Sequence, residues 1–185
     1  MKIIETALQD VHLLEPRVFT DDRGFFFESH NERHFQQLVG WPVRFVQDNH
    51  SRSKRGVLRG LHYQIHQAQG KLVRALSGEI FDVVVDLRRS SSTFGRWASF
   101  HLSSDNHHIL WVPAGFAHGF LTLSEVAEVQ YKTTDYWAAP EERCILWNDH
   151  TLGITWPLEA GGIASPLLAA KDAAGARFLD AEVYP

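Results

Sequence analysis

The sequence predicts an all-β fold, a sandwich or jelly-roll barrel with a few short helices, from three observations. Short segments rich in β-branched and aromatic residues recur along most of the 185 residues. Turn-forming residues separate them, as at Ser77-Gly78 and from Pro113 to Gly115. Only one stretch has the periodicity of a helix. Barrels of this kind have a concave mouth that alternate residues of each strand line.

The expected elements follow one another without a linker or an internal repeat, so we expect one domain spanning residues 1–185. Asn31 can cap the helix, Phe35, Leu38 and Val39 form its apolar face, and Gly40 ends it. A loop at 161–166 precedes a short C-terminal segment. Strands are expected at residues 25–28, 43–47, 71–76, 80–87, 96–102, 109–112, 119–123 and 126–133.

Composition narrows the class of protein. A net charge of −4 argues against a partner that is a nucleic acid polymer or an anionic membrane surface. Cys144 is the only cysteine, so neither an intramolecular disulfide nor a cysteine metal cluster can form. The first residues lack the apolar stretch of a signal peptide, and no run approaches the ~20 apolar residues of a membrane span. We therefore expect a cytoplasmic protein.

His62, in the segment Arg59-Gly60-Leu61-His62-Tyr63-Gln64, is a candidate general base. A free imidazole titrates near pH 6.5, which suits proton abstraction at neutral pH. Such a base needs a carboxylate on its other ring nitrogen to orient it. Three aspartates could serve, and the sequence does not choose among them: Asp82, Asp86 and Asp172.

A metal site is the competing use of His62. Two histidines at i and i+2 of a strand point the same way and can converge on one ion. The residue two after His62 is Gln64, and although His66 follows at four, the donor set is incomplete. We expect no functional metal.

Two further residues lie on faces that can turn inward. His118 shares a face with Phe116 and Phe120 if that stretch is extended, where a histidine is often only a hydrogen-bonded core residue. Tyr131 alternates with Val129, and a tyrosine there can donate a proton to an enolate or simply pack in the core.

Cations beside glycines are candidates for binding a pyrophosphate. Arg23 precedes Gly24, Arg59 precedes Gly60, and Lys71 follows Gly70. We interpret the run Arg52, Lys54 and Arg55 as a solvated surface. No glycine-rich dinucleotide motif and no P-loop is present, which argues against Rossmann or ATPase chemistry.

Taken together, these segments resemble one family, the dTDP-4-dehydrorhamnose 3,5-epimerases of nucleotide-sugar biosynthesis. The resemblance covers nearly the whole chain in the right order, which is more specific than any single motif. This chain departs from the family's pattern at two places. The residues just before Lys171-Asp172 are usually more polar than Ala169-Ala170, and Gly161-Gly162 is an additional pair of residues. The matching segments are residues 21–28, 45–51, 59–64, 69–74, 112–120, 131–136, 142–143, 147–149 and 156–157.

The resemblance implies a cupin-type jelly-roll barrel that works without metal or cofactor, as a homodimer with a shared active site. It implies that His62 is the base, Asp172 its partner, Tyr131 the acid on the opposite face of the sugar and Lys71 the cation at O4. The matching positions expected to hold the nucleotide, phosphates or sugar are Arg23, Phe26, Glu28, Gln47, Asn49, Arg59, His118, Glu142 and Lys171.

The implied substrate is dTDP-4-keto-6-deoxyglucose and the product dTDP-4-dehydro-L-rhamnose, a precursor of cell-surface polysaccharides such as lipopolysaccharide. In a 4-keto sugar both C3 and C5 are acidic, because the anion delocalises onto oxygen. A base on one face, an acid on the other and a cation at O4 therefore suffice for inversion. Three alternatives remain: an enzyme that inverts one carbon or isomerises the ketone, a metal-dependent barrel enzyme, and a non-catalytic sugar-nucleotide binding module.

Overall fold

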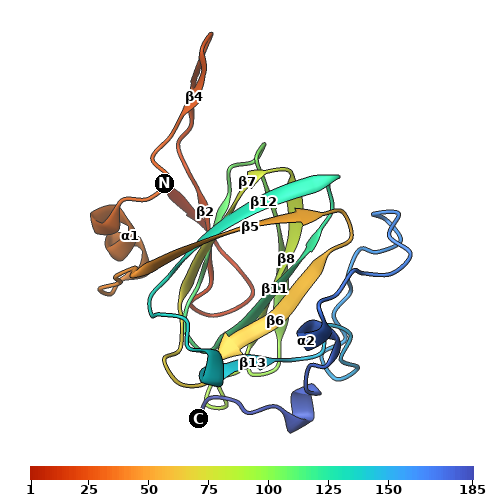
Figure 1. Cartoon of the computed structure of the whole chain (residues 1–185). Coiled ribbons are helices and arrows are strands. Elements are labelled where there is room, and N and C mark those ends of the chain that lie inside the picture. The colour runs from red at the N-terminus through yellow and green to blue at the C-terminus, as the bar shows by residue number, and fades with distance from the viewer.

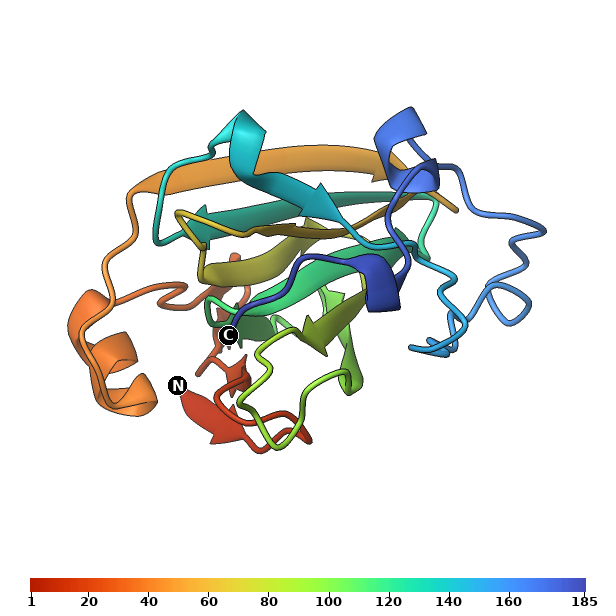
Figure 2. The ribbon, with the colours of Figure 1, turned by 90° about the horizontal axis from the view of Figure 1, so that it is seen from below.

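Two antiparallel sheets face each other in the computed structural model, which describes all residues from Met1 to Pro185 (Figures 1 and 2). In spatial order, the six-stranded sheet consists of β1 (Lys2–Ile4), β2 (His12–Glu15), β10 (Ile109–Val112), β7 (Lys71–Ser77), β12 (Val126–Thr133) and β5 (Gln47–Lys54). The five-stranded sheet consists of β13 (Glu142–Cys144), β6 (Leu58–Gln64), β11 (Phe116–Thr122), β8 (Glu79–Asp86) and β9 (Trp97–Ser103). The predicted all-β jelly-roll barrel is confirmed.

The space between the sheets is filled by the inward residues of both. On β8, residues 80, 82 and 84 point into the barrel and residues 81, 83 and 85 point out, as the alternation of a strand requires. Each fully buried Val or Leu contributes about 1.5–3 kcal/mol of stabilisation. The inner cluster includes Val73, Ala75, Ile80, Val84, Leu102, Leu110, Val112, Phe116, Phe120, Ala127 and Val129.

Both outer faces are also covered. Helix α1 (Glu32–Val39) packs Phe35 and Val39 against Trp111 on the six-stranded sheet. Asn31 caps this helix by accepting from the backbone N–H of His34, and Gly40 ends it with φ 85°, both as predicted. α1 and the C-terminal helix α2 (Ala170–Ala173) lie on opposite sides of the barrel (Figures 1 and 2).

The long C-terminal segment covers the outer face of the five-stranded sheet. It includes two 3₁₀ turns, η1 (Ala139–Glu141) and η2 (Phe178–Asp180), as well as α2. Its apolar residues pack on the outward side chains of β6, β8 and β11. This second layer explains why β8 and β11 are buried along nearly their whole length. The residues that make the layer are Ile145, Leu152, Trp156, Ile163 and Phe178.

Some strand predictions are wrong. Residues 43–46 form no strand, because Val43 packs under α1 instead, and the strand begins at Gln47. β5 has the polar sequence QDNHSRSK and lies at the edge of its sheet, so it lacks the apolar signal of a strand. β1, β2, β3, β6 and β13 lie outside the expected strands, whereas 109–112 and 126–133 are strands with the predicted bounds.

A two-stranded hairpin, β3 (Phe19–Asp21) and β4 (Gly24–Phe26), stands away from the barrel (Figure 1). Phe19, Phe25 and Phe26 are 51, 61 and 72% exposed, respectively, which is unusual for large apolar side chains. The strand predicted at residues 25–28 begins at Gly24 and ends at Phe26. None of the helices is long and apolar enough to cross a membrane.

Asp149 anchors the C-terminal layer. Its buried carboxylate accepts hydrogen bonds from the backbone N–H groups of Thr151, Leu152 and Phe178 at 2.9–3.0 Å. We predict that Asp149→Ala lowers the free energy of unfolding by about 1–3 kcal/mol, because buried donors lose their partner. Thermal denaturation measures this, with the exposed neighbour variant Asn148→Ala as the control. An equal melting temperature in the two variants would contradict the anchoring role.

Candidate active site

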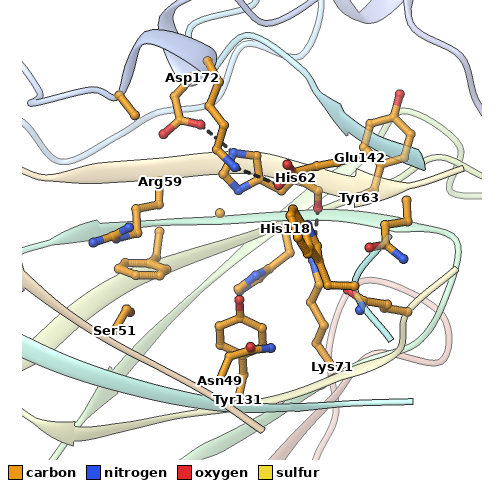
Figure 3. A pocket seen from close by; sticks show the side chains of 17 residues that line it. Asn49, Ser51, Arg59, His62, Tyr63, Lys71, His118, Tyr131, Glu142 and Asp172 are labelled. Atoms are coloured by element: carbon orange, nitrogen blue, oxygen red, sulfur yellow. Dashed lines mark hydrogen bonds and ion pairs between the residues drawn. The ribbon is translucent and has the colours of Figure 1, made fainter. Parts of the chain in front are cut away.

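A pocket of ≈ 360 Å³ opens between the two sheets, and 17 residues line it (Figure 3). β6 and β11 form one wall, while β5, β7 and β12 form the other. Because the side chains alternate, Asn49 and Ser51 of β5 both face the pocket, as do His118 and Phe120 of β11. The mouth of the barrel therefore collects polar residues from strands that are far apart in the sequence.

His62 is held by Asp172. Its Nε2 lies 2.5 Å from Asp172 Oδ1, and the carboxylate is buried while the imidazole is 23% exposed. This bond leaves Nδ1 as the free ring nitrogen. Of the three candidate carboxylates, the structure therefore pairs Asp172 with His62, and it commits Asp86 to Arg88, Ser91 and Thr93.

The backbone around His62 is unusually close to β11. Gly60 has φ +112°, and a Cβ there would lie 2.7 Å from Gly119 Cα and from the carbonyl oxygen of His118. A Cβ on Gly119 would lie 2.6 Å from the carbonyl oxygen of Arg59. These two glycines let the strands approach, so His62 and His118 occupy opposed positions on one face.

Tyr131 lies on the opposite wall. It extends from β12, where it pairs with Asn49 of β5, and its ring packs against the inner core. Burial raises the pKa of Tyr131, with a further contribution from the negative charge of Glu142. The hydroxyl thus keeps its proton at neutral pH and can donate it. Figure 3 shows Tyr131 and His62 on opposite sides of the pocket.

Lys71 is almost completely buried at the start of β7. Its ammonium donates to the carbonyl oxygen of His62 at 3.1 Å. Burial lowers the pKa of Lys71 to about 8, an effect that the negative charges of Asp82 and Glu142 oppose. Lys71 is therefore a desolvated cation in the pocket wall, and it can stabilise a negative charge that develops on a bound molecule.

His118 and Asp82 form a second, deeper pair. His118 Nε2 lies 2.8 Å from Asp82 Oδ2, and both side chains are buried. The other oxygen of Asp82 has no hydrogen-bond partner within the chain. Burial raises the pKa of Asp82, and its interactions with His118 and with the Lys71 ammonium counteract this. Asp82 thus supports the polar floor of the pocket rather than orienting His62.

The outer part of the pocket carries the remaining charges. Arg59 donates to Ser53 Oγ at 3.0 Å, and Lys171 pairs with Glu142 at 2.8 Å. Gln47 does not line the pocket, but it donates to the Asn49 side chain at 3.0 Å and accepts from the backbone N–H of Trp137. It therefore positions two residues that do.

Besides Gln47, three predicted site residues lie outside this pocket. Arg23 is at the tip of the exposed hairpin, where its guanidinium pairs with Asp21. Phe26 is on β4, and Glu28 accepts from Asn31 beside α1. By contrast, nine predicted residues line the pocket together: Asn49, Arg59, His62, Lys71, His118, Tyr131, Glu142, Lys171 and Asp172.

Sequence reasoning missed several lining residues. Trp137 is 59% exposed at the rim, and the only signal for it in the sequence was its position directly after the matching segment 131–136. Ser51 alternates with Asn49, so the strand pattern could have identified it had β5 been recognised. The others are Tyr63, Gln64, Gln69, Gly119, Phe120 and Ala169.

A family model for dTDP-4-dehydrorhamnose 3,5-epimerase matches residues 5–180. A dTDP-4-dehydrorhamnose 3,5-epimerase of Pseudomonas aeruginosa is 63% identical over 185 residues, covering 100% of both chains. The chain belongs to the dTDP-4-dehydrorhamnose 3,5-epimerase family. The family's barrel, predicted from the sequence, is therefore supported by both the strand topology and the similarity to relatives.

Solved structures agree with the family assignment. A dTDP-6-deoxy-D-glucose-3,5-epimerase from Legionella pneumophila, in complex with dTDP-4-keto-L-rhamnose, superposes with a TM-score of 0.94 at 46% identity. That match covers 98% of this chain and 94% of the other. A 3′-monoepimerase from Streptomyces bikiniensis, in complex with dTDP-quinovose, superposes with a TM-score of 0.87 at 31% identity. That match covers 94% of this chain and 86% of the other. The epimerase barrel thus serves related reactions.

The buried position of Lys71 generates a prediction for pH dependence. Lys71 carries its charge below a pKa of about 8 and loses it as the pH rises. We predict that kcat/KM falls on the alkaline side with a midpoint near pH 8, and that Asp82→Asn moves this midpoint to lower pH, since Asp82 favours the charged form. In Lys71→Met this limb should be absent. The pH profile is the measurement, and an unmoved midpoint in Asp82→Asn would refute the coupling.

Proposed function

We propose that this chain inverts C3 and C5 of dTDP-4-dehydro-6-deoxy-D-glucose to give dTDP-4-dehydro-L-rhamnose, with His62 as base and Tyr131 as acid. The observation that carries the proposal is the placement of these two side chains on opposite walls of one pocket. The similarity to the Pseudomonas and Legionella enzymes supports the substrate. We further infer a cytoplasmic location, in line with the free thiol of Cys144.

The opposed walls suit inversion. The sugar ring lies between the sheets, so His62 faces one side of the ring and Tyr131 the other. Nδ1 of His62 removes the proton from the carbon beside the ketone, while Asp172 stabilises the imidazolium that forms. Tyr131 then delivers a proton from the opposite side. Because C3 and C5 flank the same carbonyl, a small shift of the ring presents each carbon in turn.

The enolate oxygen needs a fixed positive partner. Lys71 supplies one from a dry environment, where a charge acts more strongly than in water. The hydrogen bond from the Lys71 ammonium to the backbone carbonyl of His62 fixes the position of this cation relative to the base. His118, oriented by Asp82, adds a second polar group at the same wall. Preorganised charge of this kind is usually the largest contribution to catalysis.

The nucleotide extends from the pocket toward its charged rim. Arg59 and Lys171 are exposed cations that suit a pyrophosphate, and Trp137 offers an aromatic face to a base. Asn49 and Glu142 complete the polar lining. In this arrangement the rim of the pocket binds the nucleotide, and the sugar reacts in the interior.

We also propose a homodimer in which each hairpin reaches the partner's pocket. The hairpin exposes Phe19, Phe25 and Phe26 and stands away from its own barrel, so these rings lack a covering surface within the chain (Figure 1). Arg23 at its tip would then serve the phosphates, and Phe26 and Glu28 the nucleoside. This accounts for three predicted residues that lie outside the chain's own pocket.

The division of labour between base and acid is testable by deuterium exchange. We predict that His62→Asn loses both exchange at C3 and C5 and formation of product, with turnover reduced by about 10²–10⁴-fold. Tyr131→Phe keeps the ring and its packing, so the carbanion still forms, and exchange persists while inverted product is lost. NMR in deuterated water with dTDP-4-keto-6-deoxyglucose follows both.

The same experiment examines the alternatives. Deuterium at a single carbon in the wild-type product would show an enzyme that inverts one centre. Normal inversion by Tyr131→Phe would remove the hydroxyl from the mechanism, and equal loss of exchange in both variants would contradict the separate roles.

Complementation tests the shared site. His62→Asn and the double variant Arg23→Ala/Phe26→Ala should each be inactive as homodimers. In a heterodimer of the two, one site combines the intact barrel of one chain with the intact hairpin of the other, so activity returns. Light scattering gives the oligomeric state. A fully active monomer, or co-expressed heterodimers without activity, would overturn the exchange of hairpins.

A further inference from the structure

Three side chains that can bind metal converge at the wall of the pocket. The nearest ligand atoms of His62, Cys144 and Asp172 all lie within 4.8 Å of one another. Asp172 Oδ1 is 2.5 Å from His62 Nε2 and 3.9 Å from Cys144 Sγ. Cys144 does not line the pocket, and the reaction described above leaves it without a role.

The arrangement is fixed by the sheet. Cys144 of β13 is the direct cross-strand partner of His62 on β6, so both side chains lie on the same face. Leu61 and Ile145, the next pair along, exchange both backbone hydrogen bonds. His62 and Cys144 therefore form a non-hydrogen-bonded pair, the kind in which opposed side chains are closest. Asp172 extends from α2 and contacts both side chains of this pair.

We propose that His62 Nε2, Cys144 Sγ and the Asp172 carboxylate form an inhibitory site for a thiophilic divalent cation such as Zn²⁺. Nitrogen, sulfur and carboxylate donors are the set that zinc prefers, at bond lengths of about 2.0–2.3 Å in a tetrahedron. Such a tetrahedron holds its donors roughly 3.3–3.8 Å apart, so rearrangement of the side chains by about 1 Å is enough. The fourth position is left for water.

The proton balance explains the inhibition. In the free enzyme the proton shared with Asp172 is on Nε2, and Nδ1 is the acceptor for the substrate's proton. When the cation takes Nε2, that proton moves to Nδ1, so the imidazole can no longer accept one. The thiol loses its proton to solvent as the sulfur binds. Metal binding thus releases one proton and removes the base without touching the substrate's binding groups.

The thiol is otherwise inert. Burial raises the pKa of Cys144 to about 12, with Asp172 contributing to the shift, so the sulfur is protonated in the absence of metal. A coordinating cation overcomes this because it stabilises the thiolate directly. The site therefore discriminates in favour of cations that bind sulfur, and against Mg²⁺, which prefers oxygen.

The test compares the wild type with Cys144→Ser and Cys144→Ala after removal of metals with EDTA. All three should turn over alike without metal. Added Zn²⁺ should inhibit the wild type, and EDTA should reverse this. Both variants should need at least about 10-fold more Zn²⁺, since even a change in an outer-shell partner typically costs 10–100-fold in metal affinity. Mg²⁺ at the same concentrations should have no effect.

Cobalt gives a readout that does not depend on turnover. Co²⁺ bound to the wild type should show a thiolate-to-cobalt charge-transfer band that is absent in Cys144→Ser. The inhibition rests on the proposed role of His62 as base, whereas this band reports the site alone. Equal zinc sensitivity of wild type and Cys144→Ser, or Co²⁺ bound to the wild type without the thiolate band, would overturn the proposal and indicate a surface histidine site such as His107-His108.

Discussion

The hydrogen bond between His62 and Asp172 joins the barrel to the segment that covers it. The two residues are 110 positions apart, and they meet because the C-terminal layer buries the outer face of the five-stranded sheet. Apolar packing of Trp156, Ile163 and Phe178 thus determines where α2 lies, and α2 determines where the carboxylate lies. The geometry of the His62–Asp172 pair is in this sense a product of core packing, with Asp149 anchoring the same layer.

Charge inside the barrel is the second constraint. Lys71, Asp82 and His118 are buried together, and desolvation disfavours the charged forms of both Lys71 and Asp82. Each such group would be destabilising alone, but opposite charges at short range offset much of that cost. In the proposed mechanism this cluster presents the positive charge of Lys71 where water is excluded.

The sequence predicted the all-β barrel, and nine of the predicted site residues line one pocket; its failures have physical causes. Strands buried on the inside, such as Ile109–Val112 and Val126–Thr133, carry an apolar signal and were located to the residue. β5 has one buried residue in eight, so its signal was absent although it carries Asn49 and Ser51. The sequence could not show which of three aspartates pairs with His62, because packing of the C-terminal segment on the five-stranded sheet brings Asp172 to it. The hairpin's isolation from its own barrel is likewise a property of the three-dimensional arrangement alone.

The contact between Gly60 and Gly119 has a consequence for protein engineering. The two backbones touch where any larger residue would collide with main-chain atoms, so the distance between the strands that carry His62 and His118 is a fixed dimension of the scaffold. A mutant library aimed at bulkier or smaller sugars gains nothing at these two positions. Pocket width is adjustable through side chains on the opposite wall and the rim, such as Ser51 and Trp137, where substitutions leave the strands that carry His62 and His118 unchanged.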